Sequence, residues 1–261
     1  MTKKKFFAQT YIWLLLTILY APILIIAIFS FTTTKVLGNW SGFSTELYSS
    51  LFGGVNISLM YAIENTLSIA VIAAVLSTML GAIAAIGIYN MHGRKRQAIV
   101  FMNNLPMLNP DIITGISLFI MFVALGITQG YLTVVLAHVS FCTPYVILCI
   151  MPRLKQMNPN VYEAAVDLGA TPWQALRKVL IPQMWPGIIS GLILSFTLSI
   201  DDFAVTLFTK GNQGLETLST YIYADARKGG LTPELRPLMT VIFVTVLLLL
   251  VIINIRTKKK N

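Results

Sequence analysis

The hydrophobic positions along the chain gather into six long runs, which polar segments separate. The runs cover about residues 11–31, 61–89, 98–125, 131–151, 184–208 and 237–255. Each is close to the ~20 apolar residues that a helix needs to cross a hydrocarbon core of ~30 Å at ~1.5 Å per residue. The pattern predicts an all-α integral membrane protein whose six transmembrane helices form a single domain over residues 1–261.

The composition excludes a water-soluble fold. Hydrophobic residues make up 56% of the 261 positions and charged residues only 11%, whereas soluble domains carry about 25% charged residues. The mean hydropathy is +0.76. Water cannot accommodate so much apolar surface, so membrane lipid is the first partner that we expect.

The net charge of +9 is unevenly placed along the chain. Basic residues cluster near both termini, in the turn at 94–96 and in the polar loop at 152–183, whereas the other polar segments hold few. Cytoplasmic loops of membrane proteins are enriched in Lys and Arg. We therefore predict that both termini lie inside (N-in/C-in). Membrane topology accounts for the charge without a nucleic-acid partner.

The chain lacks the residue patterns of a motor or a catalyst. It contains no Gly-x-x-x-x-Gly-Lys-Ser/Thr segment, so no phosphate-binding loop is expected. There is no Ser/His/Asp set and no His/Cys cluster, and Cys142 and Cys149 lie too far apart for a disulfide. His138 stands alone in an apolar run and is expected to be a structural hydrogen-bonding residue. We predict no catalytic residue, no metal site and no cofactor in this chain, and we do not expect an enzyme.

The polar loop at 152–183 is longer than a simple connection and carries helix-capping residues. An Asn-Pro pair at 158–159 is typical of a helix start, and Gly169 of a helix end. The Thr-Pro-Trp-Gln segment at 171–174 predicts a second start with a capping box. Pro182 is expected to end this second helix. We expect two short helices at a bend on the cytosolic face; the alternative is an ordered loop without a partner.

This loop also resembles the EAA loop of ABC importer permeases. It keeps that pattern's spacing, with Glu-Ala-Ala at 163–165, Gly169 after three residues, and Val-Leu-Ile-Pro at 179–182 after nine more. The replacements at Val179 and Ile181 are apolar for apolar, and the loop lies between the fourth and fifth predicted spans, as in the family. The resemblance implies the ABC type I importer permease fold, with this loop as a cytosolic coupling helix.

The same resemblance implies docking residues and partners. The residues expected to dock on a cytosolic ATPase are Glu163, Ala164, Ala165, Gly169, Thr171 and Pro182. ATP and Mg²⁺ would be bound by that separate dimer of ATPase subunits. A second homologous permease subunit would supply the other half of the translocation pathway.

Three acidic residues lie within the predicted spans: Asp111, Asp201 and Asp202. Ionisable groups are costly in a bilayer and by default face a pathway or a partner. They are the candidate pathway residues for a cationic substrate, with Phe203 as an aromatic contact. Asp111 also fits simple helix capping, and Phe203 fits an interfacial aromatic belt. Consecutive helical residues point about 100° apart, so at most one of the two adjacent acids faces a pore directly; the other binds a neighbouring helix or lies at the outer water boundary.

Three segments, two of which contain these acids, resemble those of C-type permease subunits of spermidine/putrescine importers. The matching residues are 65–67, 109–115 and 195–203, and the resemblance extends from about residue 11 to the sixth predicted span. It implies a multi-pass polyamine permease of the cytoplasmic (inner) membrane, supplied by an extracytoplasmic polyamine-binding protein. Related permeases carry ferric iron, sulfate or molybdate, so an ABC permease for another solute is the alternative. A membrane scaffold or an intramembrane enzyme is a remote alternative.

Overall fold

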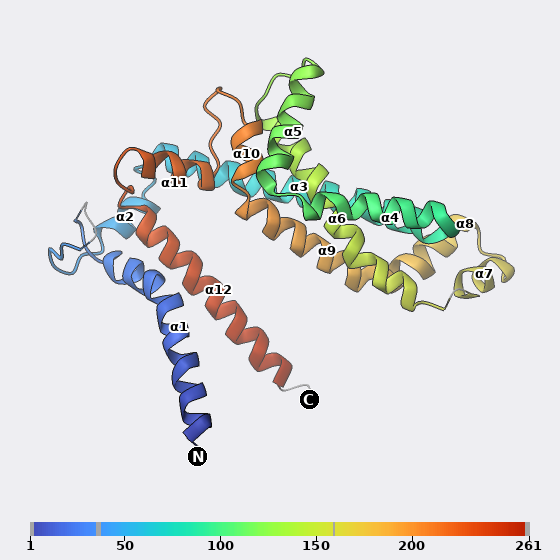
Figure 1. Cartoon of the computed structure of the whole chain (residues 1–261), viewed down its shortest axis with the longest axis horizontal. Coiled ribbons are helices and arrows are strands. Elements are labelled where there is room, and N and C mark those ends of the chain that lie inside the picture. The colour runs from blue at the N-terminus through green and yellow to red at the C-terminus, as the bar shows by residue number, and fades with distance from the viewer. Residues whose placement is uncertain (1–2, 35–37, 159, 259–261) are drawn as a thin grey trace. The chain divides into compact units, whose positions relative to one another are not determined.

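The computed structural model describes residues 3–34, 38–158 and 160–258, and the regular structure among them is helical throughout (Figure 1). The chain forms two compact units: unit 1 holds residues 1–60 and 222–261, and unit 2 holds residues 61–221. The elements are α1 (Lys3–Phe29), α2 (Glu46–Phe52), α3 (Ile57–Asn90), α4 (Gly93–Leu108), α5 (Asp111–Ala124), α6 (Tyr131–Gln156), α7 (Asn160–Asp167), α8 (Pro172–Ala175), the π-helical turn η1 (Leu176–Leu180), α9 (Ile181–Asp201), α10 (Ala204–Thr209), α11 (Leu218–Arg227) and α12 (Leu235–Lys258).

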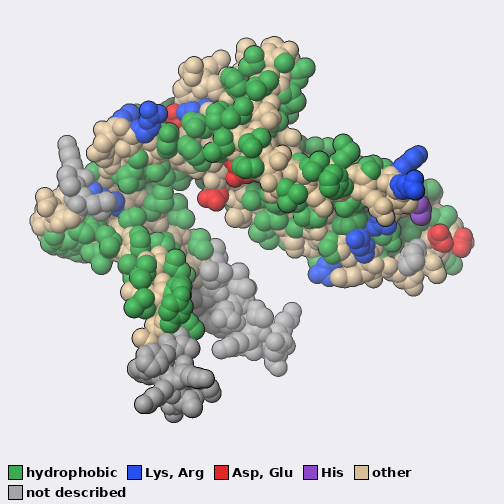
Figure 2. All heavy atoms as spheres, in the orientation of Figure 1, with side chains coloured by type: hydrophobic (Ala, Val, Ile, Leu, Met, Phe, Trp, Pro, Cys, Tyr) green, Lys and Arg blue, Asp and Glu red, His purple; other side chains and the backbone are tan. Residues whose placement is uncertain are grey.

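Four helical segments are long and apolar enough to cross a membrane: Gln9–Phe29, Ile57–Asn90, Tyr131–Gln156 and Pro172–Asp201. The bent pair α4 and α5 gives a fifth if the two helices form one span, and α12 adds a shorter apolar stretch, Leu235–Leu248. Hydrophobic side chains spread over the visible surface of both units (Figure 2). The all-α prediction is confirmed over the described residues, while the count of six spans, the single domain and the N-in/C-in orientation stay predictions.

Unit 1 is built around the packing of α1 on α12. The rings of Tyr20 and Phe243 meet across this contact, with 6.5 Å between their centroids. Beyond the end of α1, Phe31 stacks on Phe43 and lies 5.1 Å from the ring of Tyr48 in α2. The polar segment after the first predicted span therefore has a short helix and aromatic packing of its own.

The core of unit 2 contains the antiparallel pair α6 and α9, the two helices that flank the polar loop at 152–183. A β-carbon on Gly187 would come within 3.0 Å of the Cys149 carbonyl oxygen, and one on Gly191 within 3.0 Å of Val146 Cγ1. Small residues at four-residue spacing let membrane helices approach closely. Those on the α6-facing side of α9 are all buried: Gly187, Gly191, Ser195 and Ser199.

The third predicted span, residues 98–125, is two helices that meet at an angle of 107°. Helical backbone is disfavoured for a residue that precedes proline, and Asn109 is accordingly extended, with φ −83° and ψ 139°. Pro110 then starts α5, since its carbonyl oxygen accepts hydrogen bonds from the backbone N–H groups of Ile113 and Thr114. The interruption that the sequence indicates is thus a sharp bend.

The fifth predicted span, residues 184–208, is also broken. α9 ends at Asp201, and Asp202 has an extended backbone with φ −65° and ψ 131° before α10 begins. α10 packs closely on α5, because a β-carbon on Gly115 would lie 3.1 Å from the carbonyl oxygen of Ala204. Each break places an acid at a helix end: Asp111 begins α5, and Asp201 ends α9.

Candidate functional site

The first half of the coupling loop (residues 152–183) follows the predicted capping chemistry. Asn158 Oδ1 accepts a hydrogen bond from the backbone N–H of Asn160 at 3.0 Å, at the start of α7. The predicted role of Pro159 lies outside the described residues. Gly169 turns the chain after α7 with φ +90°, a backbone conformation that glycine adopts without steric cost. The predicted start and end of this helix are confirmed at Asn158 and Gly169.

The second half of the loop begins with a reciprocal capping box. The Thr171 hydroxyl oxygen accepts from the backbone N–H of Gln174 at 3.3 Å, and Gln174 Oε1 accepts from the backbone N–H of Thr171 at 3.0 Å. Both bonds satisfy N–H groups that a helix start leaves without partners. The capping box predicted from the sequence is therefore confirmed.

Pro182 does not end this second helix, so that prediction was wrong. The chain is helical without interruption from Pro172 to Asp201. Proline usually disrupts a helix because it lacks an N–H and its ring clashes with the carbonyl four residues earlier. Here that carbonyl belongs to Lys178 inside η1, whose wider turn bonds the Ile181 N–H to the Leu176 carbonyl oxygen. The π turn accommodates the proline, and the coupling loop runs directly into α9.

The coupling loop exposes apolar side chains next to its predicted docking residues. Leu168 is 89% exposed and Trp173 is 65% exposed. Ala165 is half-buried, and the other five predicted docking residues are exposed: Glu163, Ala164, Gly169, Thr171 and Pro182. Exposed apolar side chains that gather among polar ones mark interaction surfaces. The loop therefore offers a surface that favours burial against another molecule.

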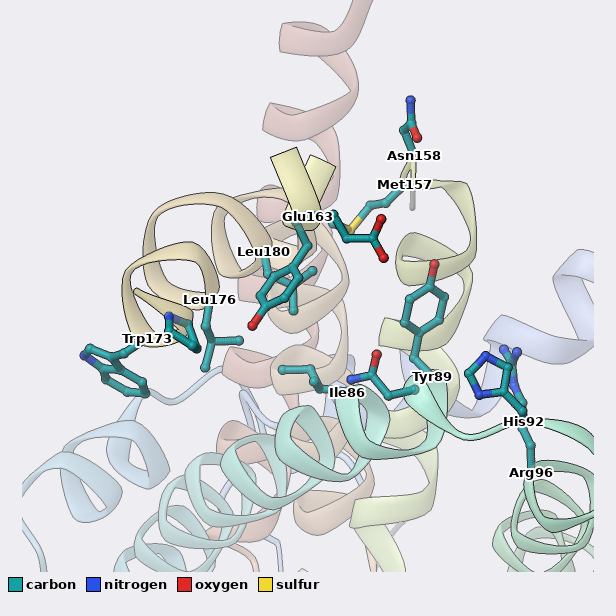
Figure 3. Close-up of a pocket in the computed structure, with 13 residues that line it drawn as sticks. Ile86, Tyr89, His92, Arg96, Met157, Asn158, Glu163, Trp173, Leu176 and Leu180 are labelled. Carbon is teal, nitrogen blue, oxygen red and sulfur yellow. The ribbon is translucent and has the colours of Figure 1, made fainter. Parts of the chain in front are cut away.

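A pocket of about 820 Å³ lies behind this surface (Figure 3). Ile86 and Leu180 belong to its apolar lining, and the Glu163 carboxylate points toward Tyr89 across it (Figure 3). The Arg96 guanidinium lies over the Tyr89 ring, 5.7 Å from its centroid. Sequence reasoning did not find the pocket, since its walls come from α3, α4 and the coupling loop, which are distant in the chain. It adjoins Glu163 and so forms part of the candidate docking surface.

Asp202, one of the three predicted pathway acids, is held inside unit 2. Its carboxylate accepts hydrogen bonds from the Val205 N–H at 3.2 Å, the Thr206 N–H at 2.8 Å and the Thr206 hydroxyl at 2.7 Å. It also lies 3.3 Å from His138 Nε2, and its side chain is only 6% exposed. Asp202 thus caps α10 and pairs with α6 rather than facing solvent.

Asp201 and Asp111 are placed differently, because both side chains are exposed. Neither forms a hydrogen bond or an ion pair through its carboxylate within the described part of the chain. Asp201 also sits at the carboxyl end of α9, where the helix dipole disfavours negative charge. Phe203 is half-buried one residue beyond Asp202. An acid with no partner at an unfavourable helix end is suited to receive a cation.

The partners of Asp202 are residues that sequence reasoning missed. His138 is 1% exposed and bonds to Ser199 and Thr206, which lie 61 and 68 residues further along the chain. This confirms the expected hydrogen-bonding role of His138. The sequence signal that could have identified these partners is that Ser199 and Thr206 are polar residues within an apolar run. No group of three or more His, Cys, Asp or Glu side chains in the described ranges could hold a metal ion.

Comparisons with known sequences identify relatives over nearly the whole chain. Residues 77–258 match the family model described as "Binding-protein-dependent transport system inner membrane component". The chain is 37% identical to the spermidine/putrescine transport system permease protein PotC of Haemophilus influenzae, over 98% of each protein. It is 40% identical to the putrescine transport system permease protein PotI of Escherichia coli, over 87% of this chain and 82% of that protein.

Solved structures show the same fold at low sequence identity. A chain of a bacterial ABC transporter involved in the import of the acidic polysaccharide alginate matches with a TM-score of 0.71 and 16% identity, over 99% of this chain and 98% of that one. A chain of the MetNI methionine ABC transporter matches with a TM-score of 0.60 and 19% identity, over 78% and 95% of the two chains. The fold is that of an ABC importer permease. The chain belongs to the family of binding-protein-dependent transport system inner membrane components, which are multi-pass, non-catalytic permease subunits.

Proposed function

We propose that the chain is the permease subunit of an ATP-driven importer and forms half of the translocation pathway for the polyamines spermidine and putrescine. The observation that carries this proposal is the likeness to a permease named for these solutes, at 37% identity over 98% of both proteins. The site agrees with it chemically. Polyamines are cations, and Asp111 and Asp201 are exposed acids without a partner in the described part of the chain.

The exposed coupling loop favours the docking of a separate ATPase. Leu168 and Trp173 gain from burial on a partner, and Glu163 offers a negative charge to a basic group there. We propose that this partner is a dimer of cytosolic ATPase subunits, which binds ATP and Mg²⁺. The docking surface comprises the predicted residues Glu163, Ala164, Ala165, Gly169, Thr171 and Pro182, with Leu168 and Trp173 added from the structure.

The proposed transport cycle needs two further proteins. A second homologous permease subunit supplies the other half of the pathway, and an extracytoplasmic binding protein delivers the polyamine. Closure of the ATPase dimer brings the coupling loops together, and the tight α6–α9 pair carries this movement from the loop through unit 2. The pathway then opens outward, accepts the polyamine beside Asp111 and Asp201, and returns.

Substrate-stimulated ATP hydrolysis tests the function. The permease is reconstituted in liposomes with its second permease subunit, its ATPase and its binding protein, and ATP hydrolysis is measured with spermidine, putrescine, ferric iron, sulfate and molybdate. We expect stimulation by spermidine or putrescine and no stimulation by the anions. Stimulation by iron or an anion alone would replace the polyamine assignment. A permease that fails to co-purify with any ATPase subunit would overturn the importer assignment itself.

A further inference from the structure

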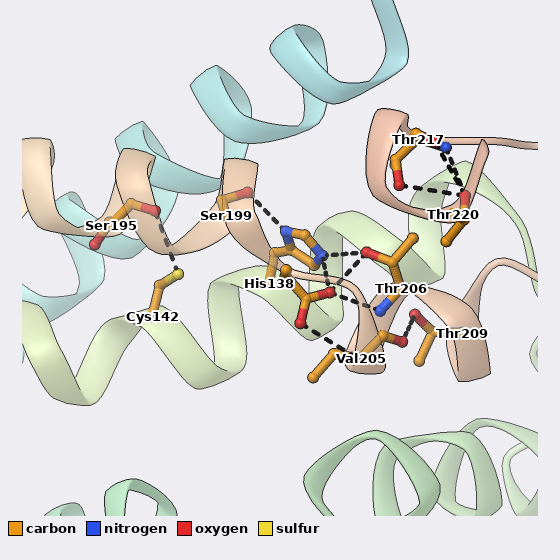
Figure 4. Close-up of polar contacts among 10 residues, drawn as sticks. His138, Cys142, Ser195, Ser199, Val205, Thr206, Thr209, Thr217 and Thr220 are labelled. Carbon is orange, nitrogen blue, oxygen red and sulfur yellow. Dashed lines mark hydrogen bonds and ion pairs between the residues drawn. The ribbon is translucent and has the colours of Figure 1, made fainter. Parts of the chain in front are cut away.

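His138 lies at the centre of a buried polar cluster that joins three helices (Figure 4). It projects from α6, and its Nδ1 lies 2.6 Å from the Ser199 hydroxyl of α9. Its Nε2 lies 2.9 Å from the Thr206 hydroxyl of α10 and 3.3 Å from Asp202 Oδ2. The cluster therefore spans the α9–α10 break from one side and ties it to α6.

The hydrogen bonds of the cluster assign its protons. Thr206 donates its hydroxyl hydrogen to Asp202, so its oxygen is free to accept from His138 Nε2. Nε2 faces two acceptors and therefore carries a hydrogen, and in the tautomer protonated at Nε2 the Nδ1 atom accepts from the Ser199 hydroxyl. Both ring nitrogens then have hydrogen-bond partners, and the Nε2–H group is directed at Thr206 and Asp202 at the α9–α10 break.

This arrangement separates the two adjacent acids. The Asp202 carboxylate accepts hydrogen bonds from the backbone N–H groups of Val205 and Thr206, and it lies 3.3 Å from His138 Nε2. Asp201, one residue earlier, is exposed in the last turn of α9. Because Asp202 is bonded to Val205 and Thr206 in α10 and lies against His138 of α6, the end of α9 is held in place. The backbone of Asp201, one residue earlier, is held with it, and its exposed side chain starts from a fixed point.

A gain in folding stability does not by itself explain why His138 and Asp202 are buried as a pair. Burying a carboxylate beside an imidazole costs desolvation energy, and apolar residues of similar volume often serve packing equally well. A pair that holds one acid inward and leaves its neighbour outward performs a task that apolar packing cannot.

We propose that His138 is a positioning residue for transport: by holding Asp202 in the α9–α10 break, it presents Asp201 to the transported solute. This inference rests on the proposed function for the nature of that solute. His138 does not touch the solute and acts only through Asp202.

Three substitutions of His138 separate its two contacts. The amide nitrogen of His138→Gln reaches the place of Nε2 and keeps a donor toward Asp202 and Thr206. The amide of His138→Asn reaches only the place of Nδ1 and keeps the contact with Ser199. His138→Ala removes both. Gln and Asn introduce the same amide group into the same buried site, so they are matched for polarity.

The readout is the number of solute molecules transported per ATP hydrolysed by the reconstituted complex, with spermidine and putrescine as the first probes. A lower yield of folded complex reduces transport and hydrolysis together and leaves this ratio unchanged. We expect His138→Asn and His138→Ala to lower the ratio about tenfold, the equivalent of losing one well-placed polar contact. His138→Gln is expected to stay within about twofold of the wild type on the same scale.

Equal ratios for the wild type, His138→Asn and His138→Ala would overturn the positioning role. A ratio that falls equally in His138→Gln and His138→Asn would overturn it too, because the contact with Asp202 would then not be the relevant one. If the wild type transports no polyamine, the proposed function fails, and the ratios are measured with the solute that it does transport. The two proposals can therefore fail separately.

Discussion

Gly81 of α3 lies directly against Val146 of α6: a β-carbon on the glycine would come within 2.6 Å of the valine Cγ1. Val146 is fully buried, and its Cγ1 would also lie 3.0 Å from a β-carbon on Gly191 of α9. The valine is thus in close contact with glycines of two helices. This packing predicts how the stability of unit 2 changes when one methyl group is added at Gly81.

Gly81→Ala is expected to destabilise the protein by about 1–3 kcal/mol, because overpacking in a close-packed core forces neighbours to move. Gly87→Ala on the same helix is the matched control, since a β-carbon there meets nothing within 4 Å. The control is expected to be neutral or to stabilise by up to about 1 kcal/mol, because alanine favours a helix over glycine. Thermal unfolding of the detergent-solubilised protein measures both. Equal midpoints for the two variants would contradict the close contact, whereas partial recovery in Gly81→Ala/Val146→Ala would support it.

Asp201→Asn and Asp202→Asn are expected to fail in different ways. Asp201 is exposed, so its amide variant should keep the wild-type unfolding midpoint and lose most spermidine uptake. Asp202→Asn leaves part of a buried hydrogen-bond network unsatisfied and should cost about 1–3 kcal/mol of stability. Uptake and thermal unfolding are measured on the same preparations. Unchanged uptake in Asp201→Asn would remove that residue from the pathway.

Leu168→Ser is expected to weaken binding of the ATPase subunit without destabilising the permease. The side chain is 89% exposed, so folding gains little from it, whereas a docked partner would bury it. The loss is expected to be about 1.5–3 kcal/mol, the value of burying a leucine. Affinity is measured by titrating the purified ATPase onto the permease. Phe52→Ser in unit 1 is the control, since Phe52 is 74% exposed outside the coupling loop and should leave this affinity unchanged.

Thr171→Ala is expected to loosen the start of α8. Loss of an N-cap hydroxyl costs about 1 kcal/mol, and the backbone N–H of Gln174 loses its acceptor. Hydrogen exchange at Gln174 and Ala175 should therefore quicken several-fold. Thr171→Ser keeps the hydroxyl and should keep the protection. Equal exchange in both variants would show that tertiary contacts rather than the cap hold this turn.

Local chemistry made the caps of the coupling loop predictable. The capping contacts of Asn158 and of the Thr171–Gln174 pair join residues only two or three positions apart, and Gly169 acts on its own turn. Such short-range contacts can be identified from the sequence alone. Pro182 failed as a helix terminator because its effect depends on the preceding turn. A π turn from Leu176 to Leu180 relieves the clash, and no residue pattern in the segment announces that turn.

The acidic residues show the opposite limit. Periodicity indicated that at most one of Asp201 and Asp202 faces a pathway directly, but it did not say which. The choice depends on His138 and Thr206, which meet only after α6 packs against α9 and α10. Likewise, Asn109 and Pro110 signalled an interruption, while the 107° angle depends on how α4 and α5 each pack within unit 2.

The absence of a break at Pro182 has a mechanical meaning. One helical segment of 30 residues runs from Pro172 to Asp201, a length of about 45 Å at 1.5 Å per residue. Trp173 and Asp201 therefore lie at opposite ends of one continuous helical segment. A tilt that a docked partner imposes at Trp173 would therefore reach Asp201 along one continuous helix, with no loop between the two residues.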